Sequence, residues 1–395
     1  MKITGAKTTL YQYRTTRRMG DANSPAGRIF RSACLVELNT DVGLSGIGIG
    51  EVRIQTYVDN LVKNVLTGHD PRGVTGLWQR MQDCFCDGIS GIAENASAAL
   101  DMALWDLKAK VNSEPLWKTL GAARPRANVY ASDNALAASD EEIYDWYSMM
   151  ARDYGIKEGK LKVGLDQDGD IRRLGQMHKA LLQQTPAPVL MIDADEYWSV
   201  KQAVRKVREM EREFDLSWVE APVRSWDFPG LKRVSNGIRA AVCIPENLSA
   251  RGGLLPFFHH HAADVIQVNT DLLGITGALQ LADAAYGFEL PVTLSAAPGN
   301  IHAHLAGAMP YFMNMEIIDP LPPEGVFTTD VHIENGRAIA GDRPGNGLEI
   351  DREALQAAQI DTPPPEYHAR RTGAGLYEVR PGKEEIASAA KGLEE

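Results

Sequence analysis

The sequence predicts an α/β protein in which a β/α barrel follows an N-terminal α+β unit. The first 50 residues partly alternate polar and apolar side chains, and residues 96–107 form an Ala-rich helical stretch. From residue 127 onward, short apolar strands alternate with amphipathic helices, and the strand ends recur at intervals of 21 to 31 residues. No Gly-x-Gly-x-x-Gly motif follows a strand and opens a helix, so a barrel is favoured over an open dinucleotide-binding sheet.

The composition is that of an ordinary globular protein, with 395 residues, 44% hydrophobic and 24% charged. The 41 Lys and Arg against 52 Asp and Glu give a net charge of −11, which argues against a nucleic-acid partner. The N-terminus has no apolar signal segment, and no apolar run is long enough to span a membrane. The four cysteines match neither a zinc site nor a disulfide scaffold. We therefore expect a soluble cytoplasmic protein.

The two ends of the chain are expected to belong to one further unit. Residues 31–38 and 46–51 have the pattern of strands, and the next 60 residues have that of helices. After residue 322 the strand–helix alternation stops and a turn-rich segment follows. The expected organisation is an α+β domain over residues 1–125, a barrel over 126–322, and a segment over 323–395 that returns to pack on the first domain.

Polar side chains stand at the ends of the predicted barrel strands. The strands are 128–131, 160–163, 189–193, 217–220, 241–246, 264–269, 291–295 and 312–316. The polar residues at or near their ends are Lys160, Lys162, Asp193, Glu220, Glu246, Asn269, Ser295 and Glu316. Because the carboxyl ends of barrel strands open on the face where active sites lie, these side chains should converge.

Three acidic residues, Asp193, Glu220 and Glu246, end adjacent predicted strands. The alternative is that Asp193 and Glu220 simply cap the helices that follow them. Three carboxylates that converge repel one another unless a cation joins them, and hard oxygen ligands of this kind select Mg²⁺. The sequence therefore predicts a magnesium site at the barrel mouth.

Lys160 and Lys162 lie two residues apart, so their side chains point to the same face of one strand. If that face is the barrel interior, the two ammonium groups lie across from the carboxylates. Mutual repulsion and partial burial are then expected to lower the pKa of one lysine and to make it a general base. The alternative is a solvated surface pair.

Several short motifs follow one another in order along the chain. They are Gly50-Glu51, Asp101-Met-Ala-Leu-Trp105-Asp106, Lys160-Leu-Lys162, Met191-Ile-Asp193-Ala-Asp195, Trp218-Val-Glu220-Ala-Pro222, Pro245-Glu246-Asn247 and Pro344-Gly-Asn-Gly347. Together they resemble the enolase superfamily, in its mandelate racemase/muconate lactonizing group. The resemblance implies an N-terminal capping domain, a (β/α)₇β barrel, Mg²⁺, and a symmetric homo-oligomer between a dimer and an octamer. It also implies abstraction of the proton α to a substrate carboxylate, by a lysine or histidine base that works with Mg²⁺.

The resemblance also implies roles for individual residues. Asp193, Glu220 and Glu246 would ligate the metal, and Lys162 would be the base. Lys160 would lower the pKa of Lys162 and touch the substrate carboxylate, and Glu316 would hydrogen-bond the enolate. The expected substrate-binding residues are Asn269, Ser295, Asn247, Asp195, Arg28 and His302.

The sequence departs from the family pattern on the sixth and seventh barrel strands. Mandelate racemase-like members carry Asp and His there, and muconate lactonizing and dipeptide epimerase members carry Lys on the sixth strand. This chain has Asn269 and Ser295, and neither is a competent base near neutral pH. His302, seven residues beyond Ser295, is the first candidate for a second base.

A site with one base suits elimination better than racemisation, which needs an acid on the opposite face of the substrate. We therefore expect Mg²⁺-dependent dehydration of a hydroxy-acid, such as an acid sugar. The alternatives are a racemase, epimerase or cycloisomerase of a carboxylate, and a metal-binding barrel without turnover. In the loop near residues 19–31, Arg28 and Arg31 would clamp a second substrate carboxylate or lie solvated on the surface.

Overall fold

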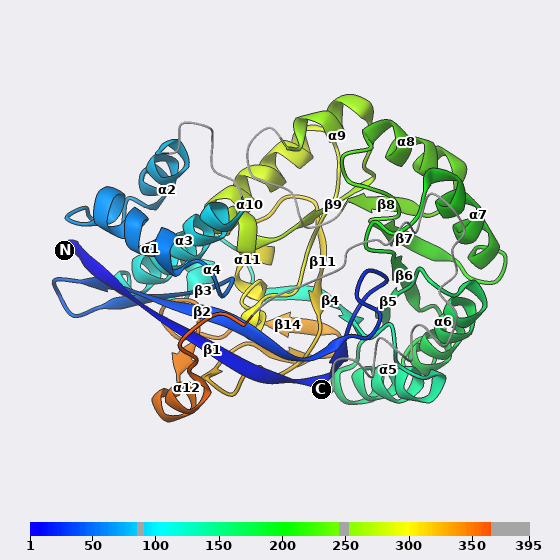
Figure 1. Cartoon of the computed structure of the whole chain (residues 1–395), viewed down its shortest axis with the longest axis horizontal. Helices are drawn as coiled ribbons and strands as arrows, with labels where there is room; N and C mark the ends of the chain where they lie inside the picture. Colours follow the sequence, from blue (N-terminus) through cyan, green and yellow to red (C-terminus); the bar gives the residue numbers. More distant parts are fainter. Residues whose placement is uncertain (85–90, 245–252, 365–395) are drawn as a thin grey trace.

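The computed structural model describes residues 1–84, 91–244 and 253–364, and a closed parallel barrel forms its larger part (Figure 1). The barrel strands are β4 (Arg126–Ser132), β5 (Glu158–Lys162), β6 (Val189–Asp193), β7 (Leu216–Glu220), β8 (Ala241–Ile244), β9 (Val265–Val268), β10 (Val292–Leu294) and β11 (Phe312–Ile317). Each strand pairs with the next, and β11 pairs in parallel with β4, which closes the barrel. The predicted fold class is confirmed.

Helical segments between consecutive strands form the outer layer of the barrel (Figure 1). They are α5 (Asp140–Tyr154), α6 (Gln167–Leu181), α7 (Val200–Met210), α8 (Phe228–Gly237), α9 (Leu255–His260), α10 (Thr270–Gly287), and the short pair η2 (Pro298–Asn300) and α11 (Ala303–Ala306). Local sequence signals set their ends. Ser139 and Ser199 open α5 and α7 with capping boxes, and Gly155 ends α5 in the left-handed conformation.

The N-terminal domain is an antiparallel meander covered by helices. Its elements are β1 (Ile3–Met19), β2 (Arg28–Thr40), β3 (Ser45–Gly50), α1 (Gln55–Leu61), the π-helix η1 (Val62–Leu66), α2 (Val74–Asp83), α3 (Ile92–Val111) and α4 (Leu116–Thr119). Gly46 and Gly48 of β3 lie against α3 so closely that a Cβ on either would meet a helix carbonyl oxygen at 2.0 Å. Only glycine permits this approach of strand to helix.

The C-terminal segment contacts both domains. Its elements are β12 (Phe327–Thr328), β13 (His332–Glu334), β14 (Arg337–Ile339), β15 (Glu349–Ile350) and α12 (Arg352–Ala358). The β13–β14 hairpin adds to barrel strand β4, an arrangement that the sequence did not predict. Asn346 contacts the N-terminal domain instead. Its backbone N–H donates to Asp106 at 2.8 Å, and its side chain donates to the carbonyl of Ile47 at 3.1 Å. The segment therefore contacts the barrel through its hairpin and the capping domain through Asn346.

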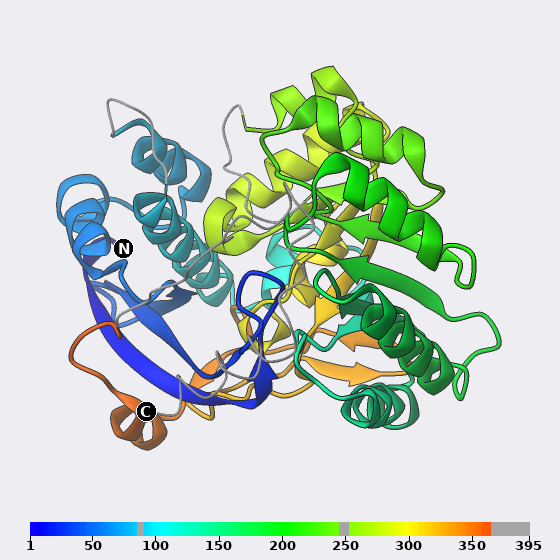
Figure 2. The same ribbon diagram turned by 45° about the vertical axis from the view of Figure 1, so that its right-hand side comes forward.

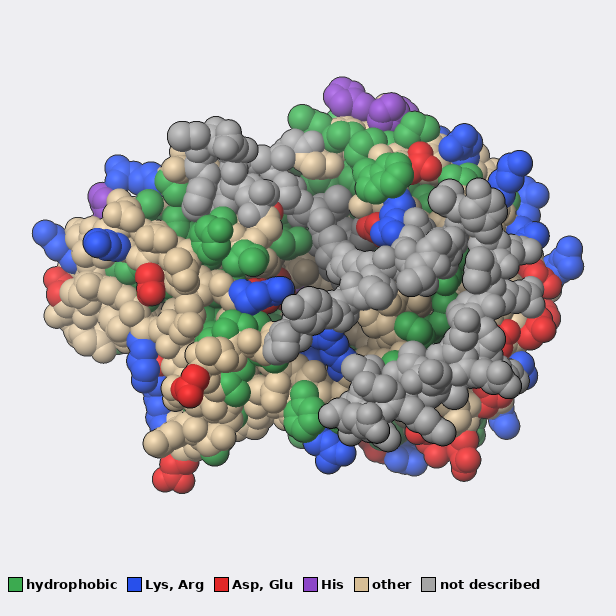
Figure 3. All heavy atoms as spheres, in the orientation of Figure 1, with side chains coloured by type: hydrophobic (Ala, Val, Ile, Leu, Met, Phe, Trp, Pro, Cys, Tyr) green, Lys and Arg blue, Asp and Glu red, His purple; other side chains and the backbone are tan. Residues whose placement is uncertain are grey.

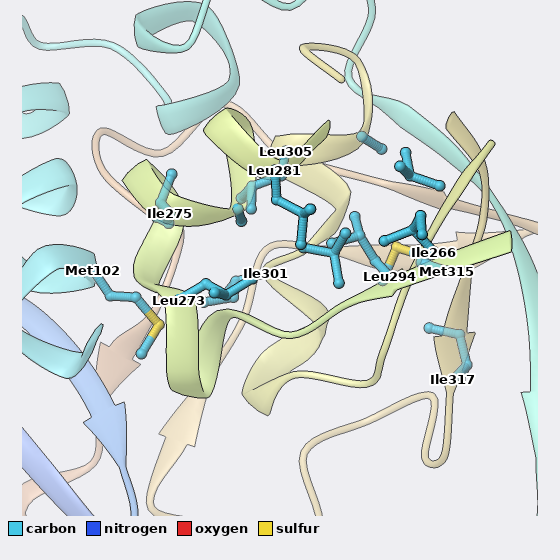
Figure 4. Close-up of a cluster of buried hydrophobic side chains, with 14 of the residues drawn as sticks. Met102, Ile266, Leu273, Ile275, Leu281, Leu294, Ile301, Leu305, Met315 and Ile317 are labelled. Carbon is cyan, nitrogen blue, oxygen red and sulfur yellow. The ribbon is translucent and has the colours of Figure 1, made fainter. Parts of the chain in front are cut away.

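One continuous apolar core joins the barrel to the capping domain. Leu294 and Met315 of the barrel strands pack toward α10, and Leu273 and Ile275 of α10 lie near Met102 of α3 (Figure 4). Burial of this shared surface holds the two domains together. Among the described residues, no helix combines the length and apolar character that a membrane crossing requires.

Candidate active site

The strand register brings the predicted lysines and acids to one level of the barrel. Lys162 of β5 is the register partner of Asp193 on β6, and Asp193 is the partner of Glu220 on β7. Side chains two residues apart on a strand share a face, so Lys160 also points inward. Its side chain is 2% exposed, which rules out the solvated surface pair.

The two ammonium groups lie among four carboxylates. Lys160 Nζ is 2.5 Å from Glu220 Oε2, 3.0 Å from Glu316 Oε1 and 3.5 Å from Asp193 Oδ2. Lys162 Nζ is 2.7 Å from Asp193 Oδ2 and 2.9 Å from Asp195 Oδ1. The structure thus brings six of the predicted site residues into one network of ion pairs.

The direction of the lysine pKa shifts contradicts the expectation from sequence. Burial alone would lower the pKa of both lysines, as expected. The attraction of Glu220 and Glu316 for Lys160, and of Asp193 and Asp195 for Lys162, is stronger and raises each pKa well above its usual value. The repulsion between the two lysines is a smaller effect, because each has a carboxylate within 3 Å.

The acids of the network divide into two groups. Burial acts to raise the pKa of Asp193, but Lys162 and Lys160 outweigh it and lower the pKa to about 2. The pKa of Glu316 is also lowered, against burial, chiefly by Lys160. Burial and the neighbouring Asp193 charge raise the pKa of Asp195 to about 8, although Lys162 opposes them. Asp193 and Glu316 are therefore ionised near neutral pH, and Asp195 is pushed toward protonation.

The donor set of Asp193 and Glu220 suits a hard divalent cation. Both carboxylates are buried, lie on register-paired positions and share the positive charge of Lys160, so this position already stabilises a cation. The third expected ligand, Glu246, and its neighbour Asn247 lie outside the described residues. Within the described ranges, no group of three or more His, Cys, Asp or Glu side chains is arranged to hold a metal.

His302 is buried at the ends of β9 and β10, where hydrogen bonds occupy both ring nitrogens. Nδ1 is 2.6 Å from the carbonyl oxygen of Ser295, and Nε2 is 2.8 Å from Thr270 Oγ1. Since a carbonyl only accepts, Nδ1 carries the proton and Nε2 accepts from the threonine. Burial lowers the pKa of His302 to about 4. His302 therefore joins two strand ends as a neutral ring.

Asn269 and Ser295 also use their side chains locally. Asn269 caps α10, because its Oδ1 accepts from the N–H of Asp271 at 2.8 Å. Ser295 Oγ donates to the carbonyl of Val268 at 3.3 Å. Neither contact activates the side chain as a base.

The connection between β1 and β2 reaches over the barrel mouth from the capping domain (Figure 2). Gly20 forms a backbone bridge with Ala135, and Asn23 Nδ2 donates to the carbonyl of Asp195 at 2.8 Å. Arg28 begins β2 at the base of this connection, where it is partly exposed and pairs with Met19 through the backbone. Asn23 thus links this connection to the network at Asp195.

Two site residues escaped the sequence analysis. Gln267 of β9 donates to Glu220 at 2.9 Å and to Tyr130 OH at 3.2 Å, and Lys160 Nζ lies 5.4 Å from the centre of the Tyr130 ring. Gln267 lies two residues before Asn269, and Tyr130 lies near the end of the first barrel strand. The two-residue period of the strands could have identified both as inward-facing.

The chain has a capping domain, a closed β/α barrel, and lysines and acids at the carboxyl ends of the barrel strands. This is the arrangement of barrel enzymes, whose active sites lie at these strand ends. Residues 144–354 match the family described as enolase C-terminal domain-like, and residues 25–121 match the mandelate racemase/muconate lactonizing enzyme N-terminal domain. The chain belongs to the mandelate racemase/muconate lactonizing group of the enolase superfamily.

Similar proteins include enzymes of more than one reaction type. L-talarate/galactarate dehydratase of Salmonella typhimurium is 28% identical over 337 residues, which cover 82% of each chain. L-Ala-D/L-Glu epimerase of Clostridium acetobutylicum is 27% identical, over 80% of this chain and 90% of the epimerase. The crystal structure of L-talarate dehydratase from Polaromonas sp. JS666, complexed with Mg and L-glucarate, is 27% identical with a TM-score of 0.79, over 91% of this chain and 98% of that one.

Proposed function

We propose that the protein is a Mg²⁺-dependent lyase that removes the proton α to a carboxylate and dehydrates a hydroxy-acid of the acid-sugar class. The observation that carries this proposal is the asymmetry of the barrel mouth. Lys160 and Lys162 stand on β5, whereas the ends of β9 and β10 carry Asn269, Ser295 and a neutral, fully hydrogen-bonded His302. One face of a bound substrate would thus meet a base, and the residues described at the ends of β9 and β10 would offer neutral groups to the opposite face.

Each residue of the network has a part in this proposal. Lys162 takes the α-proton, and Lys160 binds the substrate carboxylate by its positive charge. Glu316 lies within 3.0 Å of Lys160, and the N–H of Ala296 donates to its other oxygen at 3.0 Å, which fixes its orientation. Asp195, whose pKa is raised to about 8, would hydrogen-bond a substrate hydroxyl.

Asp193 and Glu220, with Glu246, are the proposed ligands of Mg²⁺. Bound there, the metal would neutralise these carboxylates and stabilise the enediolate oxygens of the substrate. When the charge of Asp193 is offset in this way, less attraction holds the proton on Lys162. Burial then favours the neutral amine, which is the form that a base needs.

Elimination fits this one-sided arrangement better than racemisation, since a single lysine can take the α-proton and return it to the leaving hydroxyl in a syn geometry. The dehydratase and the glucarate-bound structure among the relatives support the same substrate class. The epimerase among the relatives keeps isomerisation as the second candidate. A second copy of the chain is the expected partner, because the group assembles into symmetric oligomers.

The test is a screen of mono- and diacid sugars with the Mg²⁺-loaded protein. We expect a 2-keto-3-deoxy product from at least one acid sugar and no product when Mg²⁺ is removed by EDTA. Product stereochemistry by NMR distinguishes dehydration from epimerisation, since an epimer keeps its hydroxyl. Epimerisation without loss of water would overturn the lyase in favour of the isomerase. No reaction in any pool, together with retained Mg²⁺ binding, would favour a barrel without turnover.

A further inference from the structure

A cationic groove lies on the outer helical layer, between α7 and α8. Its accessible volume is about 560 Å³, and its lining has five cationic side chains and one acidic side chain, Glu209. The cationic residues are Lys201, Arg205, Arg208, Arg212 and Arg233. Figure 3 shows Lys and Arg side chains gathered along the edge of the molecule where these helices lie.

The cationic side chains form a stripe rather than a scatter. Lys201, Arg205, Arg208 and Arg212 follow one another at intervals of three or four residues, so they share one face of α7 and of the turn after it. At 1.5 Å per residue the stripe is about 16 Å long. Arg233 of α8 faces it across the groove.

The wall of the groove is apolar and closely packed. A Cβ on Gly237 would lie 2.9 Å from a methyl group of Val204, so the two helices meet without a gap at this point. Arg208 Nε donates to the carbonyl of Gly237 at 2.5 Å, which holds its guanidinium at the groove. Val200 adds to the apolar wall. The groove thus presents cationic side chains, with Arg208 held by this hydrogen bond, beside an apolar surface.

The charge of this groove is opposite to that of the chain. The protein carries a net charge of −11, yet the groove collects four more positive than negative side chains. A local positive field in a concave surface concentrates small anions. Arginine in particular offers paired N–H donors that match phosphate oxygens.

We propose that this groove is a binding site for a small linear polyanion that carries phosphate groups, namely a nucleoside triphosphate or inorganic tripolyphosphate. Its volume falls within the usual range of small-molecule sites, about 300–1,000 Å³. Its excess of four positive charges matches the charge of a triphosphate. A nucleic acid would meet the negative field of the remaining surface as well, whereas a small molecule does not. The site is separate from the barrel mouth, so it stands without the proposed reaction.

Isothermal titration of the full-length Mg²⁺-loaded protein with ATP, with tripolyphosphate and with adenosine tests the proposal. The charge-reversal variant is Lys201→Glu/Arg212→Glu/Arg233→Glu, which leaves Arg208 on its carbonyl. All three positions are exposed. The control, Lys7→Glu/Lys63→Glu/Arg152→Glu, makes the same charge change at exposed positions elsewhere. Because ATP and tripolyphosphate also chelate Mg²⁺ in its titration, the control shows the heat of chelation that is common to all variants. The neutral variant Lys201→Gln/Arg212→Gln/Arg233→Gln guards against loss of folding.

We expect one ATP or tripolyphosphate per chain, with affinity that falls as salt is added. The charge-reversal and neutral variants should bind roughly tenfold more weakly or worse, and the control should bind like wild type. Tighter binding of ATP than of tripolyphosphate would show that the apolar wall contacts the nucleoside, and equal binding would assign the site to the phosphate chain alone. No binding by the wild type, or equal binding by wild type and the groove variants, would overturn the proposal.

Discussion

Arg17 Nη2 donates a hydrogen bond to the carbonyl oxygen of Ile318 at 2.8 Å, just beyond the end of β11. The Nε of the same guanidinium donates to the carbonyl of Asp133 at 2.7 Å, just beyond the end of β4. Since β4 and β11 are the two strands that close the barrel, one side chain of the capping domain holds both sides of the closing seam. The last register pair of the seam is Ile317 with Ala131, one residue beyond Glu316.

Replacement of Arg17 by glutamine should destabilise the protein by about 2–3 kcal/mol, because several part-buried carbonyls lose a charged donor. The loss includes the stacking of the guanidinium on Trp146, whose ring centre lies 4.3 Å away. Urea unfolding measures this change, and Arg14→Gln, at an exposed position of the same strand, is the control. Equal stability of the two variants would mean that the clamp contributes nothing.

Lys162→Met should abolish α-proton exchange in D₂O, with a loss of several orders of magnitude in kcat, if Lys162 is the base. Asn269→Ala and Ser295→Ala should act mainly through KM, because these side chains are hydrogen-bonded locally and carry no base. NMR of the substrate α-position follows the exchange. A kcat loss for either alanine variant as large as that of Lys162→Met would indicate a second catalytic group. Racemisation would then be favoured over dehydration.

Mg²⁺ should stabilise the wild-type protein and leave Asp193→Asn and Glu220→Gln unaffected. A ligand that binds only the folded state adds about 2.7 kcal/mol at a concentration 100 times its Kd. Thermal unfolding with and without Mg²⁺ measures the difference. Glu158→Gln is a matched control, since Glu158 also faces the barrel interior but bonds to Asn314 at the start of β5. A Mg²⁺ response in either ligand variant that equals the wild-type response would refute the assignment.

His304 should make the protein less stable in mild acid. Burial lowers its folded-state pKa to about 4 from an ordinary 6.5, so the unfolded state binds a proton first as the pH falls. The histidine therefore costs no stability above pH 6.5. It costs progressively more between pH 6.5 and 4, up to about 3 kcal/mol.

Urea unfolding of His304→Gln over this pH range should show a shallower acid slope than wild type. His332→Gln, in the exposed β13–β14 hairpin, is the control and should keep the wild-type slope. An unchanged slope for His304→Gln would mean that the ring is already charged in the folded state.

Light scattering should give a mass of two or more times 43.2 kDa, in whole multiples, as expected for a symmetric oligomer of the family type. The measurement at micromolar concentration distinguishes a dimer from an octamer. A monomer under these conditions would refute the expectation.

Much of the fold, and the lysines and acids that meet inside the barrel, could be predicted because strand geometry is local. Each strand turns alternate side chains inward, so the lysines of β5 and the acids that end β6 and β7 had to share an interior once the barrel closed. The same rule would have identified Gln267. The hairpin that adds to β4 could not be predicted, because its partner strand lies about 200 residues earlier in the chain.

What the sequence by itself determined is which groups stand at the barrel mouth: two lysines, several acids, and Asn269 and Ser295 directly after β9 and β10. What only the tertiary structure decided is how those groups affect one another. Lys160 and Lys162 lie two residues apart in sequence, which suggested repulsion and a lowered pKa. Their ammonium groups are nearer to Glu220 and Asp193 from other strands, so each pKa rises instead. Electrostatic energy depends on distance in space and on burial, and neither quantity is present in the order of residues along a chain.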